Sequence, residues 1–155
     1  MLHNTYAGPT VGDIMSHPPI SVFADSELRD ARNTMRAHGI HHLLVEDRGR
    51  IVGVLSDRDV LRAISPYADG HAAQRRDDET LQRPVYSAAS YNMITVVRDT
   101  PIELAAAAML ERHISCLPVT GPDEEVVGIV TTRDLLRATV SCLIADRPAE
   151  EQPAA

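Results

Sequence analysis

The sequence predicts an α+β fold of two βαββα repeats packed about a pseudo-twofold axis, each a small sheet with its helices on one face. The main observation is an internal repeat: residues 53–63 recur 75 positions later as residues 128–138, with six of eleven residues identical. A second is that short alternating apolar runs and amphipathic runs follow in the same order in both halves. A third is length: 155 residues bury one good core or two small ones, so the repeats should pack together.

In each copy a glycine precedes a short apolar strand, and a hydroxyl residue stands between this strand and an apolar helical pattern. The hydroxyl residue is Ser56 in the first copy and Thr131 in the second. Such residues are preferred at the N-cap of a helix. Three positions later stand Asp59 and Asp134, in the first helical turn, where the helix dipole favours negative charge. The repeat therefore predicts a strand that ends at the hydroxyl residue and a helix that follows it.

The first repeat, residues 11–64, follows a flexible arm of residues 1–10. His17-Pro18-Pro19 interrupts the chain, because proline fixes φ and restricts the residue before it. The elements predicted after it are a strand over 20–22, a helix capped by Asp25-Ser26 that buries Leu28, Ala31 and Met35 and ends near Gly39, a strand over 40–45, a hairpin turn at 47–50, a strand over 51–55 and a helix over 57–64.

Residues 65–84 break this pattern. Ser65-Pro66 stops the helix, and residues 69–84 are polar and charged. The segment is predicted to be a linker with a single helical turn.

The second repeat, residues 85–140, follows the same order. Its predicted elements are a strand over 94–97, a helix that starts at Asp99-Thr100-Pro101 and buries Ile102, Ala105, Ala106 and Met109, a strand over 114–119, a turn at 121–124, a strand over 126–130 and a helix over 134–143. The helix runs into a C-terminal tail, residues 141–155, whose Pro-rich end is expected to be disordered.

Composition excludes several classes of function. The formal net charge of −7 argues against nucleic acid, which requires a basic patch. No apolar run approaches the length of a membrane span, and residues 1–10 lack the features of a signal peptide. We therefore expect a cytoplasmic protein without a membrane partner, in which Cys116 and Cys142 are buried, reduced thiols.

With these motifs in place, the chain resembles a tandem pair of cystathionine-β-synthase (CBS) domains, a stand-alone Bateman module. The resemblance covers residues 11–64 and 85–140, and its carriers are the strand–Ser/Thr–x–x–Asp–helix motifs at Ser56/Asp59 and Thr131/Asp134, together with residues 40–45 and 114–119. It implies a regulatory module that binds AMP, ADP, ATP, S-adenosylmethionine or NAD in clefts between the repeats. Such a ligand is regulatory, no cofactor is required, and an effector protein, which the sequence does not identify, would respond.

The chemistry of the motif suits an adenosine ligand. An ionised aspartate accepts two hydrogen bonds, as a ribose diol requires, and helix-start amides suit phosphate. Arg58 and Arg133 precede the two aspartates and could reach a phosphate. The alternative is that the hydroxyl residues only cap the helices, that the aspartates only complement the dipole, and that the arginines are solvated or ion-paired.

In the family, one repeat supplies the Ser/Thr and Asp of a cleft and the other repeat supplies the wall for the base. By that pattern the two expected groups are Thr131, Arg133 and Asp134 facing Pro19, Ile20, Ile40 and His41, and Ser56, Arg58 and Asp59 facing Met93, Ile94, Ile114 and Ser115. The isoleucines would sandwich the ring, unless they are ordinary core residues.

The chain departs from the pattern in three places. Leu44 stands where the second repeat has Pro118, the commoner residue in the family. Asp57 adds a negative charge that should disfavour a polyphosphate beside Asp59, which makes the Thr131/Asp134 group the stronger one. His41 would add bulk or a proton-sensitive donor to that stronger site.

Other functions fit less well. The histidines at 38, 41 and 42 lack a Cys or carboxylate at matched spacing, so we expect no metal site. No catalytic motif is present, so we expect no enzyme. The remaining alternative is a structural module that dimerises or binds a partner without a nucleotide. In either case a homodimer is expected, through apolar helix residues Val60, Leu61, Ile64, Leu135, Leu136 and Val140.

Overall fold

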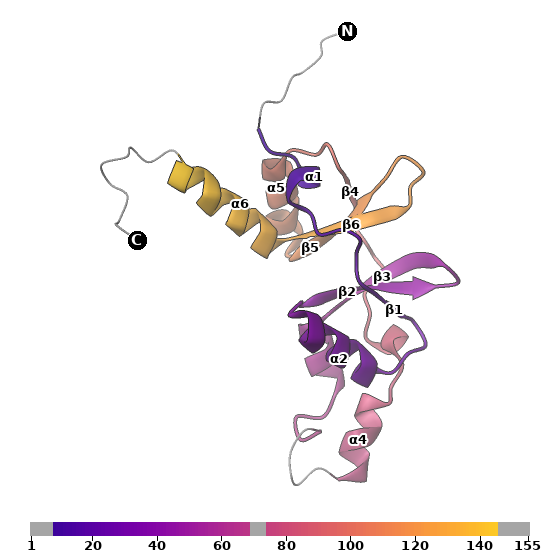
Figure 1. The fold of residues 1–155 in the computed structure, drawn as a ribbon. Coiled ribbons are helices and arrows are strands. Elements are labelled where there is room, and N and C mark those ends of the chain that lie inside the picture. The colour runs from indigo at the N-terminus through magenta and orange to yellow at the C-terminus, as the bar shows by residue number, and fades with distance from the viewer. Residues whose placement is uncertain (1–7, 69–73, 146–155) are drawn as a thin grey trace. The chain divides into compact units, whose positions relative to one another are not determined.

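The computed structural model describes residues 8–68 and 74–145, which fall into two compact units (Figure 1). Unit 1 holds residues 8–17, 95–123 and 127–145 of the described chain, and unit 2 holds residues 18–68, 74–94 and 124–126.

Unit 2 contains a three-stranded sheet in the order β1-β2-β3. Strand β1 (Ser21–Phe23) pairs in parallel with β2 (His42–Asp47), which pairs antiparallel with β3 (Arg50–Ser56). Helix α2 (Leu28–His38) connects β1 to β2 and ends at Gly39, whose φ of 63° is left-handed, as predicted from that glycine. Helix α3 (Asp57–Ala63) follows β3 directly. The predicted order of elements is confirmed.

Unit 1 repeats this arrangement with a sheet in the order β4-β5-β6. Strand β4 (Val96–Val97) pairs in parallel with β5 (Cys116–Thr120), which neighbours β6 (Val126–Thr131). Helix α5 (Ile102–Arg112) connects the first two strands, and α6 (Thr132–Ala145) follows β6. Pro101 is the N-cap of α5, one residue before the helical turn in which it was predicted.

The core of unit 2 lies between the helices and one face of the sheet. Helices α2 and α3 both contribute to it, so the helices cover the same face, as predicted. The cluster consists of Leu28, Ala31, Met35, Leu43, Val45, Leu55, Val60 and Val85. Residues of unit 1 at the matching positions are buried as well, namely Ala105, Met109, Leu117, Val119, Val130 and Leu135. The apolar periodicity that predicted the buried helix faces therefore identifies core residues in both repeats.

The first segment of each repeat packs in the unit of the other repeat. Helix α1 (Val11–Ile14) belongs to unit 1, where the Gly12 amide donates to the Arg98 carbonyl at 2.8 Å. The short 3-10 helix η1 (Val85–Ser87) belongs to unit 2, where the Tyr86 amide donates to the Ala24 carbonyl at 2.8 Å. Neither helix was predicted, because four and three residues are too few for an apolar period to be visible.

The repeated glycines lie where these segments cross a strand. The Val54 and Ser90 backbones exchange hydrogen bonds of 2.9 and 2.8 Å, and a Cβ on Gly53 would lie 2.8 Å from the Ser90 carbonyl oxygen. In unit 1 a Cβ on Gly128 would lie 2.8 Å from Met15 Sδ. A side chain at either position would push the crossing segment away, which explains why both copies of the repeat begin with glycine.

The segment predicted as a linker contains a helix, α4 (Arg75–Leu81), which contacts α2. Leu81 is buried, and the Asp77 carboxylate accepts from the Ser65 hydroxyl at 2.6 Å and from the Gln74 amide at 2.8 Å. The prediction of a single helical turn was too short, because one apolar residue and one capping aspartate are enough to fix two turns here.

The C-terminal region differs from the prediction in two ways. Helix α6 continues to Ala145, beyond the point at which a tail was predicted to begin. Cys142 lies exposed on it, whereas Cys116 is buried, so only one of the two thiols is buried as expected. Residues 1–7 of the predicted arm and 146–155 of the predicted tail lie outside the described residues.

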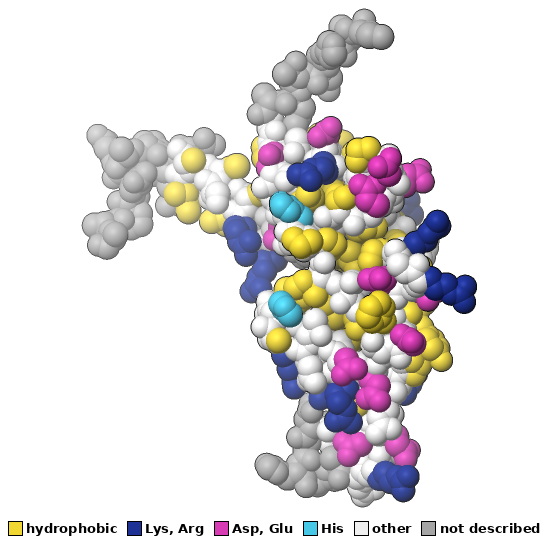
Figure 2. All heavy atoms as spheres, turned by 45° about the vertical axis from the view of Figure 1, so that its right-hand side comes forward, with side chains coloured by type: hydrophobic (Ala, Val, Ile, Leu, Met, Phe, Trp, Pro, Cys, Tyr) yellow, Lys and Arg dark blue, Asp and Glu magenta, His cyan; other side chains and the backbone are white. Residues whose placement is uncertain are grey.

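Several large apolar side chains are exposed. Figure 2 shows such residues interspersed with acidic and basic side chains on the face that it turns forward. Of the residues predicted for a dimer face, Leu61, Leu136 and Val140 are exposed, but Val60 and Leu135 are buried in their units. The prediction was wrong for those two residues. Val60 packs in the core cluster of unit 2, and Ile64 is partly buried against the same cluster.

Replacing Gly53 with alanine should destabilise unit 2 by about 1–3 kcal/mol, because the atom that the new Cβ meets is a fixed backbone oxygen. Urea unfolding followed by circular dichroism measures the loss. Gly128→Ala is the matched comparison and should lose less, because its nearest neighbour is the flexible end of Met15 and its nearest backbone atom, the Ser16 carbonyl oxygen, lies 3.0 Å away instead of 2.8 Å. If Gly53→Ala unfolds at the urea concentration of the parent, the crossing segment does not depend on this close approach.

Candidate functional site

The helix start at Ser56 is closed by a reciprocal pair of side chains. The Ser56 hydroxyl accepts from the Asp59 amide at 3.2 Å, and Asp59 Oδ2 accepts from the Ser56 amide at 3.0 Å and from the Ser56 hydroxyl. This is a capping box with aspartate as the acidic partner, and it satisfies two backbone donors that the helix leaves free. The predicted N-cap is confirmed here.

The start of α6 has the same geometry. Asp134 Oδ2 accepts from the Thr131 amide at 2.9 Å and from the Thr131 hydroxyl at 2.7 Å, and the hydroxyl oxygen lies 3.4 Å from the Asp134 amide. The Asp134 side chain is only 10% exposed, compared with 31% for Asp59. Because Oδ2 is used by the cap, any hydrogen bond to another molecule must involve Oδ1.

The Oδ1 atoms face weaker partners. Arg137 Nη1 lies 3.6 Å from Asp134 Oδ1, and Arg62 Nη1 lies 3.9 Å from Asp59 Oδ1. Both arginine side chains are largely exposed, so these ion pairs contribute little and are easily rearranged. Each aspartate therefore has one oxygen committed to the fold and one available to a donor.

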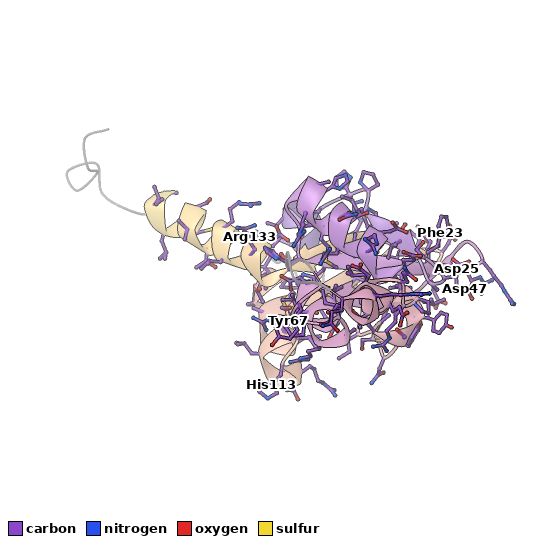
Figure 3. The ribbon with its side chains drawn as sticks, turned by 90° about the horizontal axis from the view of Figure 1, so that it is seen from below. Phe23, Asp25, Asp47, Tyr67, His113 and Arg133 are labelled. Atoms are coloured by element: carbon purple, nitrogen blue, oxygen red, sulfur yellow. The ribbon has the colours of Figure 1, made fainter. Side chains whose placement is uncertain are left out.

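Some backbone amides at the starts of α3 and α6 already donate hydrogen bonds within the protein. The Asp57 amide donates to the His41 carbonyl at 2.9 Å, and the Thr132 amide donates to the Ser115 carbonyl at 3.0 Å. Among the described residues, the amides of Arg58 and Arg133 have no acceptor, and neither guanidinium forms a hydrogen bond or ion pair. Figure 3 labels Arg133 at the start of α6. Each helix start thus offers one amide and one exposed guanidinium to an anion.

His41 lies beside Asp57 in unit 2. His41 Nδ1 is 2.7 Å from Asp57 Oδ2, and both side chains are about half exposed. The family pattern predicts that His41 belongs to the group around Thr131, whereas in the structure its ring contacts the carboxylate of Asp57, in its own repeat. The His41 ring therefore lies next to the Asp57 carboxylate, whose charge was expected to disfavour a polyphosphate.

The neighbouring His42 is more buried. Burial lowers the pKa of His42 below its ordinary value of 6.5, and the negative charge of Asp57 opposes this shift. His42 therefore resists protonation in the folded protein.

The predicted site residues are distributed over both units. Unit 1 holds Ile114, Ser115, Thr131, Arg133 and Asp134, and unit 2 holds Pro19, Ile20, Ile40, His41, Ser56, Arg58, Asp59, Met93 and Ile94. Within each unit, the residues before the central strand lie beside the helix start, through the two amide–carbonyl bonds of Asp57 and Thr132. Met93 and Ile94 lie in the same unit as Ser56, whereas the other expected wall residues lie in a different unit from the helix start that they were paired with. The pairing of each helix start with a wall from the other repeat stays a prediction.

Sequence reasoning did not single out an aromatic and acidic pocket in unit 2. It is lined by Phe23, Ala24, Asp25, Glu46, Asp47, Arg48, Val52, Tyr86 and Tyr91. These residues are spread over almost 70 positions of the chain, so no local motif connects them. The one available signal was the scarcity of aromatic residues, which makes any gathering of them notable.

The described part of the chain contains no group of three or more His, Cys, Asp or Glu side chains placed to hold a metal ion. None of its helices combines the length and the apolar character that crossing a membrane requires.

The fold and the duplicated helix starts define a class of protein, a tandem α+β module whose two repeats carry the same capped aspartate. Comparison with protein families matches the CBS domain twice, at residues 11–66 and 85–141. The chain belongs to the CBS domain family.

Relatives of very different length match this chain over most of its residues. L-aspartate semialdehyde sulfurtransferase of Methanocaldococcus jannaschii is 30% identical over 128 residues, which are 82% of this chain and 22% of that protein. The chain therefore spans about a fifth of the length of that relative. A CBS domain-containing protein of Dictyostelium discoideum is 29% identical over 135 residues, 86% of this chain and 92% of that protein.

Two solved structures are similar in fold and sequence. A CBS domain pair in complex with 5′-methylthioadenosine and S-adenosyl-L-methionine has a TM-score of 0.71 and 28% identity, covering 86% of this chain and 97% of that one. The protein CBSX2 in complex with AMP has a TM-score of 0.69 and 28% identity, covering 88% and 99%.

The lowered pKa of His42 predicts a stability that depends on pH. In the unfolded chain His42 takes up a proton near pH 6.5, whereas in the folded chain it does so only at lower pH. The free energy by which the neutral ring favours the folded state is therefore fully present above pH 6.5 and is lost as pH falls below it. In His42→Gln the free energy of unfolding should fall less between pH 7 and 5, as measured by urea titrations. His17→Gln, at an exposed position, is the control and should keep the slope of the parent. An unchanged slope in His42→Gln would contradict the assignment.

Proposed function

We propose that this chain is a regulatory module that binds an adenosine-containing nucleotide, AMP, ADP, ATP or S-adenosylmethionine, and passes the binding state to a partner protein. The observation that carries the proposal is Oδ1 of Asp134, which the cap does not use and which faces only the exposed guanidinium of Arg137 at 3.6 Å, at a helix start where the Arg133 amide has no acceptor among the described residues. The module is not itself catalytic. Its ligand is a signal and not a required cofactor.

The ribose is the group that Asp134 suits best. An ionised carboxylate accepts hydrogen bonds and does not donate them, and a ribose diol offers two hydroxyl donors. With Oδ2 held by Thr131, the carboxylate cannot turn, so Oδ1 is held in one direction. The capping box thus preorganises the acceptor, which lowers the entropy cost of binding.

The phosphate is assigned to Arg133 and its amide. A single amide and a single guanidinium suit a small phosphate better than a long one, because the Thr132 and Asp134 amides are engaged within the protein. Helix α6 has 14 residues, compared with seven in α3, and the Asp134 side chain is better shielded than that of Asp59. These differences support Thr131, Arg133 and Asp134 as the stronger site.

The second helix start, Ser56, Arg58 and Asp59, has the same parts with an additional carboxylate from Asp57. Asp57 next to Arg58 makes it less favourable for a phosphate. The base is assigned to the apolar strand-end residues predicted from the family pattern, Pro19, Ile20, Ile40 and His41 for the stronger site, and Met93, Ile94, Ile114 and Ser115 for the other.

The relatives support the chemical class of ligand. The two similar structures at 28% identity hold 5′-methylthioadenosine with S-adenosylmethionine, and AMP. These three molecules share adenosine and differ in what is attached at the 5′ position. The part they share includes the ribose, which is the group that Asp134 would contact.

One observation favours the alternative, a structural module without a nucleotide. The capping boxes alone give Asp59 and Asp134 a role, and the same box occurs at Thr10 and Asp13, where no ligand is proposed. The Thr10 amide and hydroxyl lower the pKa of Asp13 in the same way that a bound donor would. Only a ligand titration separates the two functions.

We also propose that the module is a homodimer in the cytoplasm. Helix α6 exposes Leu136, Val140, Leu143 and Ile144. Their spacing of four, seven and eight residues forms one stripe, which a second copy of the chain could cover through the same stripe. Neither Cys116 nor Cys142 forms a disulfide, which suits a reducing compartment.

Asp134→Ala should weaken AMP binding roughly 10- to 150-fold, because it removes charge-assisted hydrogen bonds. Calorimetry on the purified chain measures the affinity, and a melting curve checks the fold. Asp13→Ala is the matched control, since it removes an equivalent capping box from the same unit and should leave the affinity unchanged.

Two results would change this account. If Asp134→Ala binds like the parent while Asp59→Ala loses binding, the stronger site is the other one. If the parent binds none of AMP, ADP, ATP and S-adenosylmethionine, the structural alternative holds.

Leu143→Glu should convert the dimer to a monomer, because it places a charge in the apolar stripe. Light scattering at tens of micromolar protein gives the mass. Ser141→Glu adds the same charge on another side of α6 and should leave the dimer intact. A parent protein with the mass of one chain would refute the proposed dimer.

A further inference from the structure

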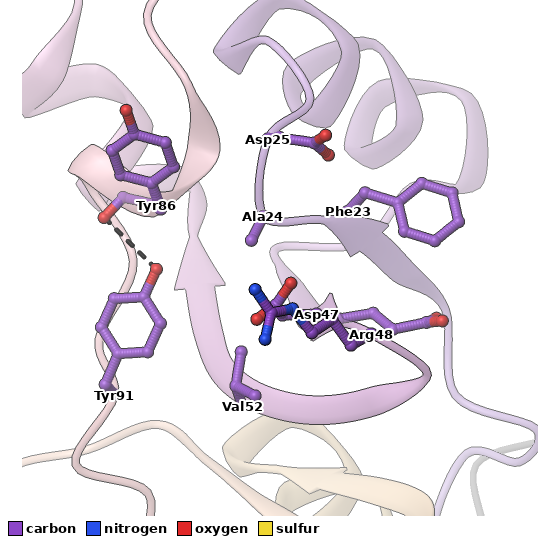
Figure 4. A pocket seen from close by; sticks show the side chains of 9 residues that line it. Phe23, Ala24, Asp25, Asp47, Arg48, Val52, Tyr86 and Tyr91 are labelled. Carbon is purple, nitrogen blue, oxygen red and sulfur yellow. Dashed lines mark hydrogen bonds between the residues drawn. The ribbon is translucent and has the colours of Figure 1, made fainter.

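Unit 2 contains a pocket of about 480 Å³ that is separate from both helix starts (Figure 4). It lies at the end of the sheet where β1 and β2 finish and the hairpin to β3 begins, whereas Ser56 and Asp59 lie at the opposite end of β3. All of its lining residues belong to unit 2. Its volume is that of a small-molecule site.

The walls of the pocket are held by backbone hydrogen bonds. The Ala24 amide donates to the Glu46 carbonyl at 2.9 Å, and the Tyr86 amide donates to the Ala24 carbonyl at 2.8 Å. The Tyr91 hydroxyl donates to the Tyr86 carbonyl at 3.3 Å, and the Tyr91 ring lies against Gly53. The lining is therefore preformed.

Three of the five aromatic residues of the chain line this pocket, and they are unusually exposed. Phe23, Tyr86 and Tyr91 are 60%, 57% and 48% exposed. In the view of Figure 4 the two tyrosines lie on one side and Phe23 on the other. Aromatic faces carry partial negative charge and attract cations.

The lining is acidic. It holds the carboxylates of Asp25, Glu46 and Asp47 and one guanidinium, that of Arg48, so its net charge is −2. Figure 3 shows Phe23, Asp25 and Asp47 gathered at one end of the unit. The Ser21 hydroxyl donates to Glu46 at 3.2 Å, but Asp25 and Asp47 form no side-chain hydrogen bond or ion pair with the described residues. Burial and the charge of Asp47 raise the pKa of Tyr91, which places this charge close to the ring.

Arg48 occupies a position that arginine rarely takes. Its φ of 49° and the φ of 76° at Gly49 form a hairpin turn in which both central residues are left-handed, a turn that favours asparagine and glycine. Its guanidinium forms no ion pair with the described residues, so it does not neutralise the carboxylates. A strained residue at the edge of a pocket is a reason to look for a function there.

We propose that this pocket binds a small organic cation, a guanidinium or an alkylated ammonium group, held by the rings of Tyr86 and Tyr91 and the carboxylates of Asp25 and Asp47. The rings supply the cation–π attraction and the carboxylates accept its hydrogen bonds or offset its charge. Arg48, which also lines the pocket, lowers the affinity by repelling the ligand. This site is independent of the nucleotide proposed above.

NMR titration of the amide and tyrosine signals tests the proposal, with methylguanidinium and tetramethylammonium as the probes. Saturable shifts in the millimolar range are expected at residues 23–25, 46–48, 86 and 91. A stronger effect of methylguanidinium supports binding led by the carboxylates, and an equal effect of tetramethylammonium supports binding led by the rings. Shifts that grow linearly without saturation would overturn the proposal.

Two variants should move the affinity in opposite directions. Asp47→Asn should weaken binding about three- to tenfold, and Arg48→Asn, which suits the turn and removes the repelling charge, should strengthen it about two- to fivefold. Asp99→Asn removes the same charge from an exposed position of unit 1 and is the control. If Asp99→Asn weakens binding as much as Asp47→Asn, or if inorganic phosphate produces the same shifts, the pocket is not a cation site.

Discussion

A reciprocal hydrogen-bonded pair between a hydroxyl residue and an aspartate three positions later fixes the helix starts on which the rest of this structure depends. It occurs at Ser56 and Asp59, at Thr131 and Asp134, and at Thr10 and Asp13. In each case one carboxylate oxygen satisfies the N-cap amide and hydroxyl together. Because these donors would otherwise be unsatisfied, the pair sets where the strand ends and where the helix begins.

The second constraint is the close approach of a crossing segment to a glycine. The segments that open the two repeats exchange units, and each crosses a strand where Gly53 or Gly128 leaves no side chain in the way. This exchange joins distant parts of the sequence within each unit. It also places Tyr86 and Tyr91 beside the hairpin of the first repeat, and so it creates the aromatic pocket.

The sequence predicted the regular elements and the helix starts because these depend on local patterns. The apolar period found Leu28, Ala31 and Met35, and the Ser/Thr and Asp spacing found both capped aspartates. It did not predict α1, η1 or the length of α4, because these are held by contacts with residues far along the chain. The pocket was missed for the same reason, since Phe23 and Tyr91 share no local motif.

The burial of Val60 and Leu135 shows the limit of pattern reading on a short helix. An apolar residue next to a polar one on α3 or α6 can face the sheet or the solvent, and the sequence alone does not decide which. The structure separates the two sets, so that Leu136, Val140, Leu143 and Ile144 remain as the exposed stripe of α6.

The central claim is that one oxygen of Asp134 serves the fold and the other serves a ribose. The most direct measurement is calorimetry of AMP and its 2′,3′-dideoxy analogue against the parent and Asp134→Ala, as a cycle that isolates one contact. The account predicts that the parent prefers AMP roughly 10- to 150-fold and that Asp134→Ala binds both equally. If Asp134→Ala prefers AMP as strongly as the parent does, the aspartate does not hold the ribose and the claim is wrong.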